Sequence, residues 1–378
     1  MVTIKGRKSS NKNPPILSHE FIIQNHADIV SCVAMVFVVG LMVQVTSPWA
    51  YTFIALQHNV TTTSPENPTL PIKYTTGWKD ACAVFFYFLI TIVMHAVVQE
   101  YIFDKLSKRL HLSKSKHSKF NESCQLITFF VLSAIWGIDI IMRDNLVVNF
   151  KSLWEDYPGA MSFSLKLFFI GQLAYWLHCY PELYFQRAKK EELLPRIVLA
   201  SIGLFFCTGA YVLNFQHVGV ILLVLSYLGD AVQHGARLIH FVSQNEKSTR
   251  LAFMVANTAF ILARVASVGL SGLVFFYGLG QIERSFDYAT GKFNIPAVQF
   301  SALGAILLFQ AYLLYHFMKR QIRYARENKT SIVSKSKSSK LRPKKKDGKK
   351  AASEDDELPE VDQATKKNLR SRSSTKAK

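Results

Sequence analysis

The segment "VGVILLVLSYLGDAVQHGARLIHF", Val218 to Phe241, has the length and apolar character of a membrane helix, but three ionisable residues interrupt it. At 100° per residue, Asp230, His234 and Arg237 fall within about 60° of one another on a helix. An ionisable group inside a bilayer is costly unless it meets a partner or water. The polar stripe therefore has three interpretations: an active site, a structural contact, or the remnant of an active site.

Long apolar runs recur along the chain, which has 378 residues, of which 49% are hydrophobic and 28 are Phe. A helix of about 20 apolar residues, rising 1.5 Å per residue, spans a hydrocarbon core of about 30 Å. We therefore expect an all-α integral membrane protein with about eight transmembrane helices. The predicted spans are 29–48, 81–103, 124–142, 161–181, 197–214, 218–236, 251–280 and 297–318.

The net charge of +19 follows the predicted topology. Cytosolic loops of membrane proteins carry an excess of Lys and Arg. If the N-terminus is cytosolic, that side holds the runs "DKLSKRLHLSKSKHSKF" and "RAKKEELLPR" and the basic tail, and the other side keeps only Lys73, Lys79, Arg143, Lys151, Arg284 and Lys292. We predict a multi-pass protein with both termini cytosolic. The first 28 residues lack an apolar core, so we expect no removable signal peptide.

The loop after the first span contains the glycosylation acceptor triplet Asn59-Val60-Thr61. The charge distribution places this loop on the lumenal side, so Asn59 is the predicted glycan site. The triplets that begin at Asn121 and Asn328 fall on the cytosolic side, where we expect them to stay unmodified.

Two cytosolic segments are strongly basic. The loop after the second span is a predicted contact for the ribosome or for anionic lipid, through Lys105, Lys108, Arg109, Lys114, Lys116 and Lys119. The tail is rich in Lys and Ser and low in apolar residues, so we expect residues 327–378 to be disordered. It has two interpretations, a solvated tail attracted to anionic lipid heads and an arm that binds ribosomal RNA through phosphates. We expect no sequence-specific nucleic-acid binding.

Four ionisable residues lie deep within predicted spans and form the predicted polar lining of the bundle, together with Arg237: His95, Asp230, His234 and Arg264. Lys166 lies near the lumenal end of its span, where it can extend to the interface. Asp230 and Arg264 lie in adjacent antiparallel spans, and an ion pair between them is the structural interpretation. The catalytic interpretation is that His234, one turn from Asp230, acts as a base in acyl transfer. The five cysteines lack the spacing of a disulfide framework or a metal site, and we predict no catalytic, cofactor or metal site.

Several long segments resemble the translocating-chain-associating membrane protein (TRAM) family: "KNPPILSHEFIIQNHADIVSCVAMVF", "VVQEYIFDKLSKRLHLSKSKHSKFNES", "GQLAYWLHCYPELYFQRAKKEELLPR" and "GAYVLNFQHVGVILLVLSYLGDAVQHGARLIHF". With "TGKFNIPAVQ", the resemblance covers roughly residues 13 to 326. It implies eight spans, cytosolic termini and a glycosylated first lumenal loop. It also implies four regions: a cytosolic segment 1–28, two spans with their loops in 29–116, a TLC-like six-helix domain 117–326 and the basic tail 327–378.

The family shares its TLC domain with ceramide synthases, whose chemistry depends on two adjacent histidines in one span and an aspartate pair further along. Here Pro195 and Arg196 stand where the resemblance would place the histidines. The later element retains only Asp230, and Ser226 stands where the enzymes tend to have histidine. The resemblance therefore implies a scaffold without the base for acyl transfer.

Three functions compete. The resemblance implies a non-enzymatic accessory protein of the endoplasmic reticulum that contacts signal sequences and nascent membrane spans at the Sec translocon. The first alternative is an acyltransferase of the ceramide synthase kind, which the missing adjacent histidine pair disfavours. The second is a lipid-binding protein whose TLC cavity holds a phospholipid or sphingolipid, with Arg264 or Arg237 meeting the head group.

Overall fold

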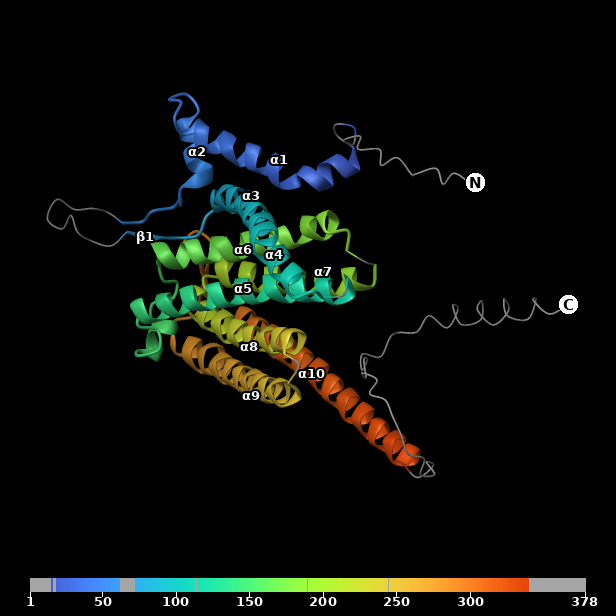
Figure 1. The fold of residues 1–378 in the computed structure, drawn as a ribbon. Helices are drawn as coiled ribbons and strands as arrows, with labels where there is room; N and C mark the ends of the chain where they lie inside the picture. Colours follow the sequence, from blue (N-terminus) through green and yellow to red (C-terminus); the bar gives the residue numbers. More distant parts are fainter. Residues whose placement is uncertain are drawn as a thin grey trace. The chain divides into compact units, whose positions relative to one another are not determined.

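The computed structural model describes residues 15, 18–61, 72–112, 114–188, 190–243 and 245–339. Eight long helices make up most of these described residues (Figure 1): α1 (His19–Gly40), α3 (Asp80–Val98), α5 (Lys114–Arg143), α6 (Phe163–Phe185), α7 (Lys190–Val212), α8 (Gln216–Val242), α9 (Glu246–Ser271) and α10 (Pro296–Ser339). The chain divides into a compact unit up to His316 and a second unit from Phe317 onward. The all-α membrane fold predicted from the sequence is confirmed.

Short elements join the helices at the two ends of the first unit. They are α2 (Ser47–Ile54), β1 (Lys73–Tyr74), η1 (Gln99–Phe103), α4 (Asp104–Arg109), η2 (Phe150–Leu153), β2 (Met161–Ser162), η3 (Gly272–Gly278), η4 (Leu279–Gln281), β3 (Ser285–Asp287) and β4 (Lys292–Asn294). β1 pairs antiparallel with β2, and β3 pairs antiparallel with β4. We call the end of the unit that carries these two sheets the sheet end.

Tyr157 joins the loops at the sheet end. Its hydroxyl donates to the Leu213 carbonyl at 2.9 Å and accepts from the Phe293 amide at 3.1 Å. Burial raises the pKa of Tyr157 to about 12, so the hydroxyl keeps its proton at neutral pH. The opposite end holds α4, the start of α5 and the start of α7, and we call it the basic end. There His19 bonds Tyr184, and Arg196 lies 3.0 Å from Glu122.

The eight long helices of the described chain alternate in direction between the two ends. An even number of membrane crossings places the two ends of a chain on the same side of the membrane. Within the part of the chain that the structure describes, seven helical segments are long and apolar enough to cross a membrane. The remaining predicted span, 161–181, is the fourth along the chain and corresponds to α6, which is 23 residues long. Buried polar residues such as Lys166, Gln172 and His178 reduce the apolar character of this helix. A helix of that length measures about 35 Å, which is enough to span a bilayer.

The first span begins and ends earlier than the predicted 29–48. Its helix α1 starts at His19, where Ser18 caps it by accepting a hydrogen bond from the Phe21 amide, and it ends at Gly40. The Thr46 hydroxyl donates to the Gly40 carbonyl at 2.8 Å, and the separate helix α2 begins at Ser47, with Pro48 in its first turn. The apolar run therefore contains a turn that its composition does not reveal. Most of α1 is exposed on the side away from α3.

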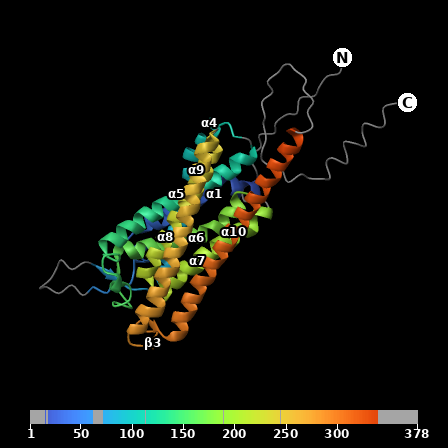
Figure 2. The ribbon, with the colours of Figure 1, turned by 90° about the horizontal axis from the view of Figure 1, so that it is seen from below.

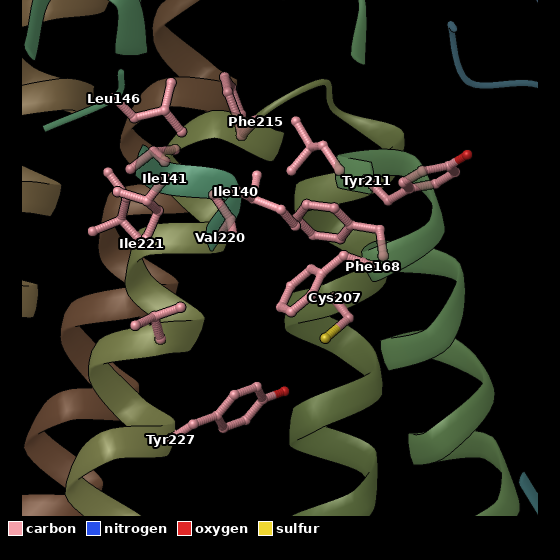
Figure 3. Close-up of a cluster of buried hydrophobic side chains, with 14 of the residues drawn as sticks. Ile140, Ile141, Leu146, Phe168, Cys207, Tyr211, Phe215, Val220, Ile221 and Tyr227 are labelled. Atoms are coloured by element: carbon pink, nitrogen blue, oxygen red, sulfur yellow. The ribbon is translucent and has the colours of Figure 1, made fainter. Parts of the chain in front are cut away.

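The core of the first unit lies between α5, α6, α7 and α8. Phe168 and Cys207 are fully buried, and Val220 and Tyr227 project toward them from α8 (Figure 3). The helices α8 and α9 lie side by side (Figures 1 and 2), and α10 approaches α7 through Phe309, whose ring centroid lies 5.0 Å from that of Phe206. The backbone of α10 is helical through Ser339, within the predicted tail, and residues 340–378 lie outside the described residues.

Candidate functional site

A buried ion pair at the sheet end corrects the sequence interpretation of Lys166. The side chain does not extend to an interface: it is fully buried, and its Nζ lies 2.8 Å from Oδ1 of Asp80. Nζ also donates to the carbonyls of Gln57 and Thr75, at 2.8 and 2.7 Å. The Tyr211 hydroxyl donates to Oδ2 of Asp80 at 2.7 Å. The cluster ties the loop after α2 to α3, α6 and α7, which is a structural role.

A second buried polar network lies near the basic end and contains His95. Nε2 of His95 lies 3.1 Å from Oε1 of Glu182, and Nδ1 lies 3.1 Å from Nε2 of His178. Nδ1 of His178 contacts the Tyr175 carbonyl, which can only accept a hydrogen bond. Gln186 joins the network: its Nε2 lies 3.3 Å from Nε2 of His95 and donates to Oε1 of Glu182 at 2.9 Å. Arg196 reaches the same network through Gln186.

This network brings together two histidines that are 83 positions apart in the chain. The sequence has no adjacent histidine pair, yet His95 of α3 and His178 of α6 are in contact, with ring centroids 5.2 Å apart. Glu182 is only 8% exposed. Among the described residues, no group of three or more His, Cys, Asp or Glu could hold a metal ion.

Asp230 and Arg264 form a third polar group, midway along α8 and α9. Arg264 is 4% exposed, and its Nη1 donates to Oε1 of Gln310 on α10 at 3.1 Å. The charge of Asp230 acts on the guanidinium of Arg264. Cζ of Arg264 lies 5.1 Å from the centroid of the Phe260 ring. Its Nη2 lies beside Gly229, where an added Cβ would be 3.5 Å from it. Its Nε and Nη2 have no hydrogen-bond partner among the described residues.

The other two residues of the predicted stripe, His234 and Arg237, lie further along α8, toward the basic end. The ring of His234 packs near Phe130, with centroids 5.8 Å apart. Arg237 is exposed, one turn closer to the basic end. Of the three residues of the predicted stripe, Asp230 is the one whose charge acts on the buried Arg264.

A cavity of about 270 Å³ lies beside this polar group, between α7, α8 and α10. Most of its wall is apolar, including Leu213, Phe215, Val218 and Phe275 toward the sheet end and Phe206 and Phe309 along its side. Its polar residues are Ser226, Tyr227, Asp230, Ser301 and Gln310. Among the described residues that line it, none is a histidine. The resemblance implied a cavity in this domain, but its lining residues could not be identified from the sequence because they come from helices distant along the chain.

The packing of α7 against α6 shapes this cavity. A Cβ at Gly203 would overlap the ring of Trp176, so glycine is required for the approach of the two helices. Trp176 donates to the Tyr227 hydroxyl at 3.3 Å, and Tyr227 donates to Oε1 of Gln172 at 2.8 Å. One turn and a half along α7, Gly209 lines the cavity, and a Cβ there would meet nothing within 4 Å.

The predicted surface sites lie at opposite ends. Asn59 is exposed at the sheet end, and its Oδ1 accepts from the Thr61 amide at 2.9 Å. Exposed cationic side chains gather at the basic end: Lys105, Lys108, Arg109, Lys116 and Lys119. Lys114 begins α5, but its side chain lies outside the described residues.

Residues 119–319 match a family model described as the TLC domain, and this range runs from the first turns of α5 into α10. The chain is 43% identical over 318 residues to mouse translocating chain-associated membrane protein 2, covering 84% of this chain and 85% of the mouse protein. The chain belongs to the family of translocating chain-associated membrane proteins. The human protein of that name is 41% identical over the same shares of the two chains.

A more distant similarity connects the TLC domain to an enzyme. Sphingosine N-acyltransferase LAG1 of Saccharomyces cerevisiae (strain YJM789) is 22% identical over 182 residues, which is 47% of this chain and 42% of the yeast protein. The similarity to the two mammalian proteins covers most of this chain, whereas the similarity to the yeast enzyme covers less than half of it.

Proposed function

We propose that this protein is an accessory factor of protein translocation in the endoplasmic reticulum, which contacts signal sequences and nascent membrane spans as they leave the Sec translocon. The observation that carries the proposal is the 43% identity over 84% of the chain to a protein named for its association with translocating chains. The protein acts by contact and without turnover. Both termini are cytosolic, and Asn59 is a lumenal glycan site.

The direction of the helices supports this topology. The start of α1 and the exposed lysines of α4 lie at the same end of the first unit, while Asn59 lies at the sheet end. If the basic end is cytosolic, the positive-inside rule is satisfied and the acceptor triplet is in the lumen. The exposed cations of α4 and α5 are then placed to meet the ribosome or anionic lipid heads.

The size of the cavity determines where a nascent span could bind. A helix of 20 residues is about 30 Å long and at least about 10 Å wide, so its volume is about 2,400 Å³. The cavity of about 270 Å³ is far too small for it. A nascent span would therefore bind on the membrane-facing surface, where α1 exposes apolar side chains including Val33, Val36 and Val39. A differential stabilisation of about 1–3 kcal/mol there would shift a marginal insertion equilibrium about 5- to 150-fold.

The enzymatic alternative is less well supported. Acyl transfer needs a positioned base, most often a histidine. The histidine pair seen here, His95 and His178, is engaged with Glu182 and Tyr175 and does not line the cavity. Asp230 is the acidic side chain in the cavity wall, and its charge balances Arg264.

Proteoliposomes that contain the purified Sec translocon and signal-recognition-particle receptor, with and without this protein, test the proposal. Each preparation is programmed with a weak and a strong signal sequence and scored for signal cleavage and protease protection. We expect stimulation of the weak signal and little change for the strong one, because only marginal signals are sensitive to a few kcal/mol. An equal yield with and without the protein for both signals would contradict the proposal.

A further inference from the structure

We propose that the cavity between α7, α8 and α10 binds one chain of a membrane lipid that carries a neutral, hydroxyl-bearing head group, with the head group beside Asp230 and Gln310. This inference goes beyond the proposed translocation function and is independent of it. It rests on the size of the cavity, the position of its polar residues and the charge balance around Arg264.

The cavity matches a single hydrocarbon chain in size. The space of one water molecule in the liquid is about 30 Å³, and a methylene group is of similar size, so 270 Å³ accommodates at least about nine methylene groups. Along α8, the lining residues from Val218 to Asp230 span about 18 Å. The wall is apolar over most of that length, as the surroundings of an acyl chain should be.

Ser301 lies near the sheet end, five residues into α10, but the other polar residues lie together further along this path. Asp230 lies 14 residues into α8 and Gln310 lies 14 residues into α10, and both helices start at the sheet end. Both residues are therefore about 21 Å from that end, near the middle of the bilayer. Ser226 is one turn from Asp230 on the same face of α8 and also lines the cavity. A chain can lie toward the sheet end while its head group reaches these three residues.

The charges in this place favour a neutral head group. The negative charge of Asp230 acts on Arg264, whose exposed fraction is 4%. Because the two charges are opposite, the pair contributes no net charge. An anionic or cationic head group would add an unbalanced charge at mid-membrane depth, which is costly. A hydroxyl can donate to the Asp230 carboxylate. It can also accept from the Gln310 amide nitrogen, since Arg264 already occupies the amide oxygen.

The head group also supplies the reason for binding. Moving an acyl chain from the bilayer into an apolar cavity gains little, because both environments are apolar. A hydroxyl leaves the hydrated interface to enter the cavity, and Asp230 and Gln310 can replace the hydrogen bonds that it loses there. Selectivity should therefore depend on the head group, and occupancy should depend on the free volume of the cavity.

The test uses the full-length protein in phosphatidylcholine vesicles and a monoacylglycerol probe with a photoreactive group in its acyl chain. The fatty acid and the phosphatidylcholine with the same chain serve as comparison probes. Labelled positions are mapped by mass spectrometry. We expect the monoacylglycerol to label residues of the cavity wall at least fivefold more strongly than either comparison probe.

Two glycine variants separate binding in the cavity from labelling of the outer surface. Gly209→Leu places a side chain in the free space of the cavity, where a Cβ meets nothing within 4 Å. Gly269→Leu makes the same change on an exposed, equally open position of α9 and is the control. We expect at least a tenfold loss of wall labelling in Gly209→Leu and none in Gly269→Leu. Equal labelling in the two variants, or labelling spread over the outer surface, would overturn the proposal.

Asp230→Asn tests the head-group selectivity. The substitution keeps the shape but leaves the positive charge of Arg264 unbalanced, so the preference should shift from the monoacylglycerol to the anionic fatty acid. A wild-type protein that prefers the fatty acid or phosphatidylcholine would overturn the neutral-head assignment. If Asp230→Asn does not fold, the comparison of probes on the wild-type protein and the glycine variants still determines the outcome.

Discussion

At the residue scale, Asp80 and Lys166 form an ion pair in which both side chains are buried. Replacing Lys166 with Met leaves Asp80 buried without its cation, and breaking a buried pair in this way costs about 3–5 kcal/mol. We expect a clear decrease in the melting temperature of the purified protein in detergent. The melting temperature is measured by size-exclusion chromatography of samples heated to increasing temperatures.

Lys151→Met is the matched control for Lys166→Met. Its partner Glu155 is 3.9 Å away, and both side chains are more than half exposed, so this pair contributes little. If the two substitutions had equal effects on the melting temperature, the structural role of the buried pair would be wrong.

His58, in the loop before β1, gives the protein a pH dependence. Burial lowers the pKa of its imidazole, and the charges of Lys166 and Lys79 act in the same direction, against the opposite effect of Asp80. The unfolded chain then binds more protons than the folded one below the ordinary histidine pKa of about 6.5. The stabilisation from neutral His58 is therefore complete above about pH 6.5 and decreases as the pH falls below it.

Melting temperatures measured from pH 7.5 to pH 5 in wild type and His58→Gln test this dependence. We expect the wild-type melting temperature to decrease more over this interval, because the variant lacks the titrating ring. Other histidines titrate in both proteins and cancel in the comparison. Parallel curves for the two proteins would show that His58 does not contribute.

At the element scale, α7 carries two glycines with opposite requirements. Gly203→Ala forces a Cβ into the ring of Trp176, and such overpacking costs about 1–3 kcal/mol. Gly209→Ala meets open space, and replacing a mid-helix glycine with alanine stabilises by about 0.5–1 kcal/mol. Thermal unfolding of the two variants, made in the same helix, should therefore shift in opposite directions. Equal shifts would show that α6 and α7 do not pack as described.

The sequence predicted the helices better than their contacts. Apolar runs located the eight long helices of the described chain, seven of which are long and apolar enough to cross a membrane, because a membrane helix needs about 20 apolar residues. The end of α1 was missed because the turn after Gly40 lies within an apolar run. The pairing of Lys166 with Asp80, and of His95 with His178, was missed because each joins helices that are distant in the sequence.

At the scale of the whole molecule, the topology predicts a single site of glycosylation. Asn59 lies at the sheet end, and Asn121 lies in α5 near the basic end, where its amide bonds Asp104. We expect Asn59→Gln to abolish the gel shift removed by an endoglycosidase in cells, and Asn121→Gln and Asn328→Gln to leave it unchanged. A glycan on Asn121 would require the opposite orientation of the bundle.

The central claim is that the protein contacts signal sequences, and site-specific photocrosslinking tests it most directly. Ribosomes carrying arrested nascent chains, with a photoreactive residue in the apolar core of a weak signal sequence, are bound to proteoliposomes that contain the Sec translocon and this protein. The control places the same residue in the polar mature region. We predict an adduct from the signal sequence and none from the mature region. The absence of an adduct, or equal adducts from both positions, would contradict the proposed function.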